Sequence, residues 1–101
     1  MGTRLELHRK LEEFLGNSHV YYQPPASVKM EYPCIVYSKD NIRSTHADDA
    51  GYSFINRYIV TIINKMPDND VIYKLLRLPY CSYDRHYVSD NLNHDVLILY
   101  Y

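Results

Sequence analysis

Glycine is scarce in this sequence of 101 residues, which contains only Gly2, Gly16 and Gly51. Loops that bind phosphates or dinucleotides use closely spaced glycines, because the backbone N–H groups must approach the ligand closely. The three glycines here are far apart, so the sequence has no such loop. A nucleotide-dependent enzyme is therefore not expected.

Basic charge and long apolar runs are also missing. The 11 Lys and Arg residues are balanced by 12 Asp and Glu residues, giving a net charge of −1, whereas proteins that bind the phosphate backbone of nucleic acids carry basic clusters. The longest apolar run, residues 96–101, is far shorter than the ~20 residues that span a bilayer. We expect neither a nucleic-acid-binding protein nor a membrane protein.

The only two cysteines, Cys34 and Cys81, lie in apolar, strand-like segments. No signal-peptide pattern opens the sequence, which favours reduced, buried thiols over a disulfide. Tyrosine, in contrast, is abundant, with 12 Tyr against 2 Phe and no Trp. Tyrosines suit surfaces that are half exposed in a monomer and covered in an assembly. The alternative is a small sheet with tyrosines on its solvent face.

Two helices are predicted. The first begins at a capping box in residues 3–6 and ends at Gly16, a residue that favours the left-handed conformation after a helix. The second begins at Asp68 as N-cap and ends before Pro79. The apolar residues of the first helix recur at helical spacing and form one stripe: Leu7, Leu11, Phe14 and Leu15.

Strand-like segments occupy residues 19–23, 34–38 and 52–65, and a hairpin closes the chain over residues 81–101. The middle of 52–65 is apolar at every position, which predicts a central strand covered on both faces. The resulting order, α-β-β-β-α-β-β, predicts an α+β fold: a mostly antiparallel sheet of about five strands with two helices packed on it. We expect a single domain, 1–101.

A long polar loop is predicted at residues 39–51. Thirteen mostly polar residues are more than a hairpin turn needs. Such a loop is either a docking arm that contacts a neighbouring subunit or a solvated insertion. If it is a docking arm, the candidate contact residues are Arg43, His46, Asp48 and Asp49.

The closing hairpin carries the only constellation that suggests chemistry. A three-residue turn at 89–91 would place His86 opposite His94, with Asp84 on the same face. Two histidines and one carboxylate are the ligands of a known class of metal site. The alternative is a set of ordinary cross-strand contacts. Because zinc-ligand spacings are absent, we assign no metal, no cofactor and no catalytic residue, and we expect no enzyme.

Four segments carry a resemblance to known proteins: VYYQPP (20–25), MEYPCIVY (30–37), RYIVTIINKMPDND (57–70) and LPYCSYDRHYVSDNLNHDVLILYY (78–101). They resemble a family of small neck proteins of long-tailed bacteriophages and prophages, described as tail terminator or tail completion (tail-to-head joining) proteins. The similarity covers most of the chain and is weakest in the first helix and in residues 39–51.

The resemblance implies a structural virion protein, made in the bacterial cytoplasm and located in the tail neck. It implies a hexameric ring of identical subunits that caps the tail tube, stops its polymerisation and meets a head-side connector or stopper protein. DNA would pass through the ring without specific binding. The family supplies no catalytic motif. Another neck component, a head-closure or stopper protein, is the alternative.

A ring of identical subunits needs two different patches that fit each other. We expect the loop at 39–51, together with Tyr52 and Tyr58 as exposed tyrosines, to supply part of these patches.

Overall fold

Helices and strands follow one another in the predicted order. The computed structural model describes residues 3–27, 29–47, 51–66 and 68–101, and at residues 43, 45–47 and 51–53 it describes the backbone alone. The elements are α1 (Arg4–Leu15), β1 (Val20–Tyr22), β2 (Cys34–Ala47), β3 (Gly51–Asn64), α2 (Asp70–Leu76), β4 (Cys81–Ser89) and β5 (Leu92–Tyr100).

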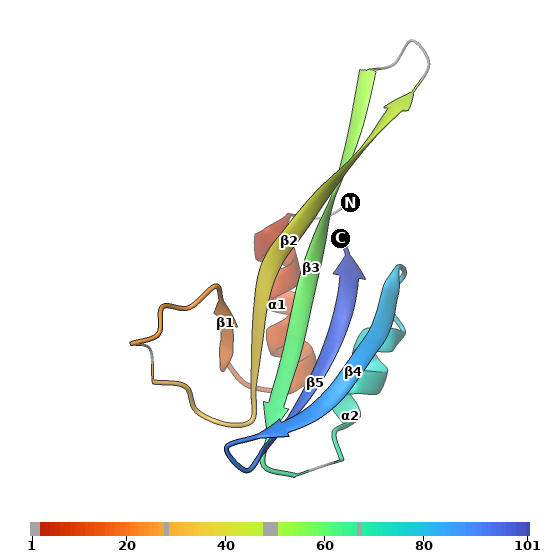
Figure 1. Cartoon of the computed structure of the whole chain (residues 1–101). Helices are drawn as coiled ribbons and strands as arrows, with labels where there is room; N and C mark the ends of the chain where they lie inside the picture. Colours follow the sequence, from red (N-terminus) through yellow and green to blue (C-terminus); the bar gives the residue numbers. More distant parts are fainter. Residues whose placement is uncertain (1–2, 28, 48–50, 67) are drawn as a thin grey trace.

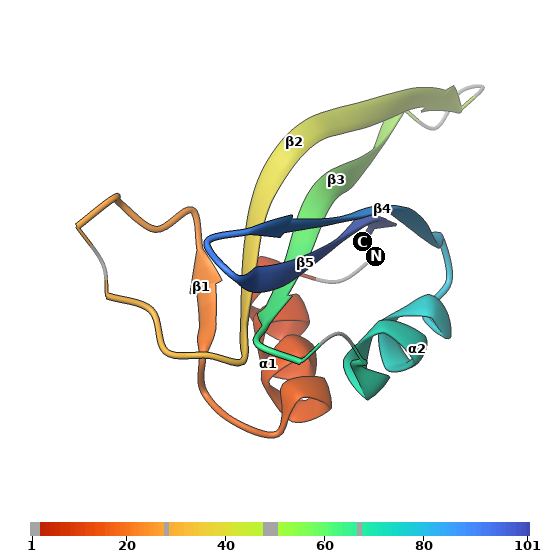
Figure 2. The same ribbon diagram turned by 60° about the horizontal axis from the view of Figure 1, so that its bottom comes forward.

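The five strands form one sheet in the order β1-β2-β3-β5-β4. Strand β1 runs parallel to β2, and the other neighbouring strands are antiparallel. This confirms the predicted α+β fold with a mostly antiparallel sheet. Both helices lie on the same face of the sheet, as the two views in Figures 1 and 2 show.

Helix α1 begins and ends as its sequence predicts. The hydroxyl of Thr3 accepts a hydrogen bond from the Glu6 amide at 3.2 Å, and Gly16 ends the helix with φ 83° while its N–H donates to the Glu12 carbonyl. A Cβ on Gly16 would meet nothing within 4 Å. Glycine is therefore needed there for its backbone conformation and not for space.

Helix α2 has a different N-cap from the one predicted. The side chain of Asn69, not of Asp68, accepts a hydrogen bond from the Val71 amide at 2.9 Å. Asn69 has the extended backbone of an N-cap, with φ −147°, and it directly precedes the first helical residue. Asp70 then lies in the first turn, where the helix dipole favours a carboxylate.

The hydrophobic core lies between the two helices and the face of the sheet that they cover. Alternate residues of β2, β3 and β5 point into it, together with the apolar stripes of both helices. Its buried residues are Leu7, Leu11, Val20, Ile35, Tyr37, Tyr58, Val60, Ile62, Val71, Leu75, Leu97 and Leu99.

Strand β3 occupies the centre of the sheet, as predicted, but the helices cover only one of its faces. On the opposite face no helix of the described chain packs on the sheet; Val36, Ile59 and Ile98 are half-buried there, whereas Cys34, Ile63 and Val96 are buried. The expectation of a strand covered on both faces therefore holds for only part of β3. An apolar run in a strand indicates burial, but it does not identify the element that covers each side.

The predicted loop at 39–51 is also wrong. Strands β2 and β3 pair in antiparallel register from Cys34↔Ile63 as far as Ala47↔Gly51, so most of these residues are strand. The physical reason is that this part of the hairpin extends beyond the core. Both of its faces meet solvent, so polar side chains are compatible with strand structure and the alternating apolar pattern is absent.

Candidate assembly interface

A two-stranded hairpin projects from the sheet. Strand β5 pairs with β3 only from Arg57 onward, and β1 pairs with β2 only at residues 35–37. Beyond these points β2 and β3 pair with each other and leave the body of the molecule (Figure 1). We call residues 41–47 and 51–56 the arm. The arm lengthens the molecule to 52 × 27 × 23 Å.

Among the side chains of the arm that the structure describes, two large apolar ones are exposed. Ile42 is 49 % exposed and Phe54 is 52 % exposed. The register pairs Ile42 with Asn56 and Ser44 with Phe54, and directly opposed residues of neighbouring strands point to the same face. Ile42 and Phe54 are therefore diagonal neighbours on one face of the arm. Two such side chains on a narrow ribbon form an apolar contact surface outside the core.

The root of the arm is held by polar contacts. A β-bulge shifts the register between Lys39 and Asn41, and Asp40 Oδ2 lies 3.1 Å from Nε of Arg57. This contact is an ion pair without hydrogen-bond geometry. The Ile42 amide donates to the side chain of Asn41 at 2.8 Å. These contacts fix where the arm leaves the sheet.

Half of the candidate contact residues, Arg43, His46 and Tyr52, map to the arm. Arg43 is opposite Ile55, and His46 is opposite Tyr52, in the register of the two strands. The side chains of Arg43, His46 and Tyr52 lie outside the described part of the structure, as do Asp48 and Asp49 entirely. His46 and Tyr52 are therefore opposed in the strand register. The role of the candidate residues in subunit contact stays a prediction.

Tyr58 is not an exposed contact residue. It is only 2 % exposed and belongs to the core beneath the helices. Its ring meets Tyr37 edge to face, with centroids 5.9 Å apart. Burial raises the pKa of Tyr58 above the usual 10.0. The expectation of exposure is wrong because Tyr58 shares the core-facing side of β3 with Val60 and Ile62.

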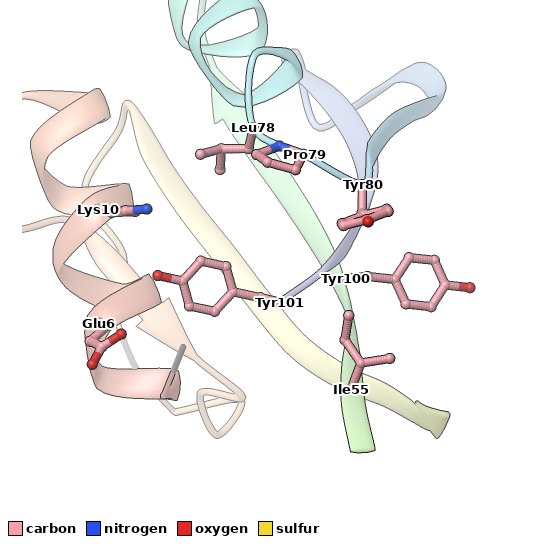
Figure 3. Close-up of a pocket in the computed structure, with 8 residues that line it drawn as sticks. All are labelled: Glu6, Lys10, Ile55, Leu78, Pro79, Tyr80, Tyr100 and Tyr101. Atoms are coloured by element: carbon pink, nitrogen blue, oxygen red, sulfur yellow. The ribbon is translucent and has the colours of Figure 1, made fainter. Parts of the chain in front are cut away.

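A cavity of about 300 Å³ opens beside the root of the arm. Its lining includes Lys10 of α1, Ile55 of the arm and a group of residues near the ends of β4 and β5, as Figure 3 shows. The Lys10 ammonium lies 5.4 Å from the centroid of the Tyr101 ring. We call this surface the tyrosine cradle, defined by Lys10, Ile55, Leu78, Tyr80, Tyr100 and Tyr101.

Tyr80 has an unusual backbone conformation. Its φ is 61°, in the left-handed region that costs a non-glycine residue roughly 1–2 kcal/mol. Its side chain is 75 % exposed at the edge of the cradle, while its carbonyl accepts a hydrogen bond from the Tyr100 amide. Strain and exposure of an aromatic ring at one position are features of contact sites. The sequence carried no local signal for this conformation.

The closing hairpin has a shorter turn than predicted. Ser89 is opposite Leu92, and Asp90 and Asn91 form a two-residue turn with φ 53° and 62°. Positive φ at both central positions is the type I′ pattern that suits the twist of a hairpin. The register is therefore one residue away from the expected one, and a shift by one residue turns each side chain to the other face.

The shift separates the three candidate metal ligands. His86 is opposite Asp95, whereas His94 is opposite Tyr87 and stacks on its ring at 4.6 Å. Asp84 lies at a bulge, and its Oδ2 lies 3.7 Å from Nη1 of the neighbouring Arg85. Within the described residues no three His, Cys, Asp or Glu side chains are placed to hold a metal ion.

The hairpin instead carries a buried carboxylate. Asp95 is 4 % exposed, and its Oδ1 accepts hydrogen bonds from the Tyr83 hydroxyl at 2.8 Å and from Nδ1 of His86 at 2.7 Å. Desolvation of its hydroxyl and the hydrogen bond to Asp95 raise the pKa of Tyr83 to about 12, although 43 % of the residue is exposed. The cluster joins β4 to β5. The sequence signal for this buried carboxylate was an acidic residue directly before an apolar run.

Both cysteines are free thiols, as expected. Burial raises the pKa of Cys34 and of Cys81 to about 11. The reactive species of a cysteine is the thiolate, so burial disfavours the reactive form at neutral pH. Cys34 is buried and Cys81 is half-buried.

Comparison with known proteins adds no relative: no protein-family model matches the chain, and no curated protein matches it. Among the described residues no helix is long and apolar enough to cross a membrane. Among the described residues, the arm and the tyrosine cradle are two surfaces with exposed apolar or aromatic side chains outside the core.

Proposed function

We propose that the chain is a structural protein of the phage neck. It acts as a tail terminator whose copies form a ring on the tail tube, stop its polymerisation and join the tail to the head connector. The observation that carries this proposal is the arm, which places Ile42 and Phe54 in solvent beyond the core. A hairpin that stabilises no core of its own serves contact with another molecule.

The similarity of four sequence segments to tail terminator proteins supports the same function. Two of these segments cover residues 57–64 of β3 and both strands of the closing hairpin. The net charge of −1 suits a ring around DNA, because a surface without basic clusters lets the phosphate backbone pass without binding it. The protein acts by contact, and no catalytic residue is proposed.

Tube growth tests this function directly. Purified chain is added to polymerising subunits of the tail tube protein, and tube lengths and ends are imaged by electron microscopy. We expect shorter tubes with additional ring-shaped density at one end. A matched control replaces residues 44–54 with Asn-Gly, which joins the opposed residues Arg43 and Ile55 through a two-residue turn. We call it the arm-shortened variant and expect it to leave tube growth unchanged.

Two results contradict the proposal. One is an unchanged length distribution with bare tube ends at a molar excess of the wild-type chain. The other is binding of the chain to the head-side connector with no effect on tubes, which would identify a head-closure or stopper protein instead.

A further inference from the structure

We infer that the tyrosine cradle of one copy receives the arm of a second copy, with Phe54 and Ile42 of the arm packing against the rings of the cradle. This contact deepens the proposed function and rests on it, because it names the two patches that join neighbouring subunits in the ring.

The exposed area of the molecule is larger than that of a compact monomer, which favours a macromolecular partner. A compact monomer of 12.0 kDa is expected to expose roughly 6,000 Å², whereas this chain exposes 6711 Å². The exposed area of 6711 Å² exceeds the expected area by roughly 700 Å². A stable protein interface buries about 800 Å² on each partner. The surplus surface of one chain is thus about what one standard interface covers.

The arm cannot reach the cradle of its own chain. Ile55 lines the cradle at the root of the arm, and Phe54 is its neighbour in the same strand, so the two side chains point to opposite faces. Residues 42–47 and 51–54 extend away from the body of the molecule (Figures 1 and 2). A second copy is therefore the source of an arm that enters the cradle.

The two surfaces match in chemistry. The arm presents one aliphatic and one aromatic side chain, Ile42 and Phe54. The cradle presents Ile55 and the rings of Tyr80, Tyr100 and Tyr101 around a cavity of about 300 Å³. Offset or edge-to-face contacts between such rings stabilise an interface, and tyrosine hydroxyls remain hydrated at its rim.

The contact has the symmetry that a ring requires. Arm and cradle are different patches of one chain, so their association is heterologous and continues from subunit to subunit until the ring closes. A patch that binds a copy of itself would end at a dimer. The geometry of arm and cradle therefore favours an assembly larger than a dimer.

Two variants that each damage one patch test the contact. Phe54→Asp changes the arm, and Tyr80→Asp changes the cradle at a position where aspartate tolerates the positive φ. Val88→Asp is the matched control, since Val88 is exposed on β4 and belongs to neither patch. Sedimentation of each full chain is measured from about 1 μM to about 1 mM, the range of moderate to weak affinities. Circular dichroism confirms that each variant is folded.

We expect wild-type protein and Val88→Asp to associate with rising concentration. Each patch variant alone should associate at least about 30-fold more weakly, the loss typical of a central interface residue. A 1:1 mixture of Phe54→Asp and Tyr80→Asp should form dimers and nothing larger, because only one intact arm and one intact cradle remain in each pair.

Wild-type protein that stays monomeric at the highest concentration overturns the inference. So does association of either patch variant at wild-type strength, or a mixture that stays monomeric. The proposed function is assessed separately by tube capping. Rings that cap tubes despite Phe54→Asp would leave that function standing and reject this contact. Association through arm and cradle without any capping of tubes would support this contact and reject the proposed function.

Discussion

Nδ1 of His86 lies 2.7 Å from Oδ1 of Asp95, across the pair of strands that ends the sheet. The Tyr83 hydroxyl approaches the same oxygen at 2.8 Å. Because an ionised carboxylate only accepts hydrogen bonds, both groups donate to it. A carboxylate with 5 % of its side chain exposed thus holds the edge strand β4 on the sheet through two side chains.

Removal of this carboxylate should weaken the fold. Asp95→Ala loses two charge-assisted hydrogen bonds, and we expect the free energy of unfolding to fall by about 2 kcal/mol. Asp95→Asn keeps one acceptor oxygen and should cost less. Asp84→Ala, a change at a weakly paired carboxylate of the same hairpin, should stay within about 0.5 kcal/mol. Urea unfolding measures the stability of all three variants. Equal effects of Asp95→Ala and Asp84→Ala would contradict the stabilising role of the buried Asp95 carboxylate.

Stability should decline in alkali because of Tyr83. The pKa of this hydroxyl is 10.0 ordinarily and about 12 in the folded chain. Below pH 10.0 both states keep the proton, so the stabilisation is complete. Between the two pKa values the unfolded state loses the proton while the folded state keeps it, and unfolding becomes easier as pH rises.

The variant Tyr83→Phe isolates this effect. Burial also raises the pKa of Tyr37 and Tyr58, so wild-type protein and variant should both lose stability above pH 10.0, but the variant with a shallower slope. Thermal unfolding at a series of pH values up to about 12 measures the difference. Parallel curves for the two proteins would show that the environment of Tyr83 does not favour its protonated form.

The two-residue turn of the closing hairpin should tolerate glycine and reject a β-branched residue. Asn91 has φ 62°, which asparagine tolerates and valine does not. We expect Asn91→Val to lower the free energy of unfolding by about 1–2 kcal/mol, and Asn91→Gly to leave it unchanged or raise it slightly. Chemical denaturation measures both. A neutral Asn91→Val would favour the three-residue turn that the sequence had suggested.

The arm should be dispensable for folding. In the described residues, strand pairing of 44–47 with 51–54 involves no third strand, and neither Ile42 nor Phe54 belongs to the core. The arm-shortened variant should therefore unfold within about 1 kcal/mol of wild-type protein, as changes distant from the core usually do. Thermal unfolding by circular dichroism measures this. A larger loss would mean that the arm supports the body of the molecule.

Much of the fold was predictable from local patterns. The stripe at Leu7 and Leu11, the stop at Gly16 and the central position of β3 each depend on residues a few positions apart, and all three were predicted correctly. The N-cap of α2 was missed by one residue, because Asp68 and Asn69 are both good caps and the backbone conformation selects between them.

The candidate site was predictable only in outline. The polar segment at 39–51 was interpreted as a docking arm or an insertion, but Ile42 and Phe54 were not singled out, because isolated apolar residues in a ribbon have no periodicity. Tyr58 was misassigned because one tyrosine in a strand has no sign that distinguishes the core face from the solvent face. The left-handed backbone of Tyr80 was not predicted, because residue composition does not indicate a positive φ at a tyrosine.

What the sequence by itself determined is the set of elements, their order and the absence of glycine-rich or basic motifs, because short-range periodicity and caps act within a few residues. Only the tertiary structure decided the hairpin register, the extension of β2 and β3 into an arm, and the meeting of Ile55, Tyr80 and Tyr101 in one cradle. These features depend on pairing and packing between residues distant in the chain, and a shift of one residue in register turns every side chain of a strand to the other face.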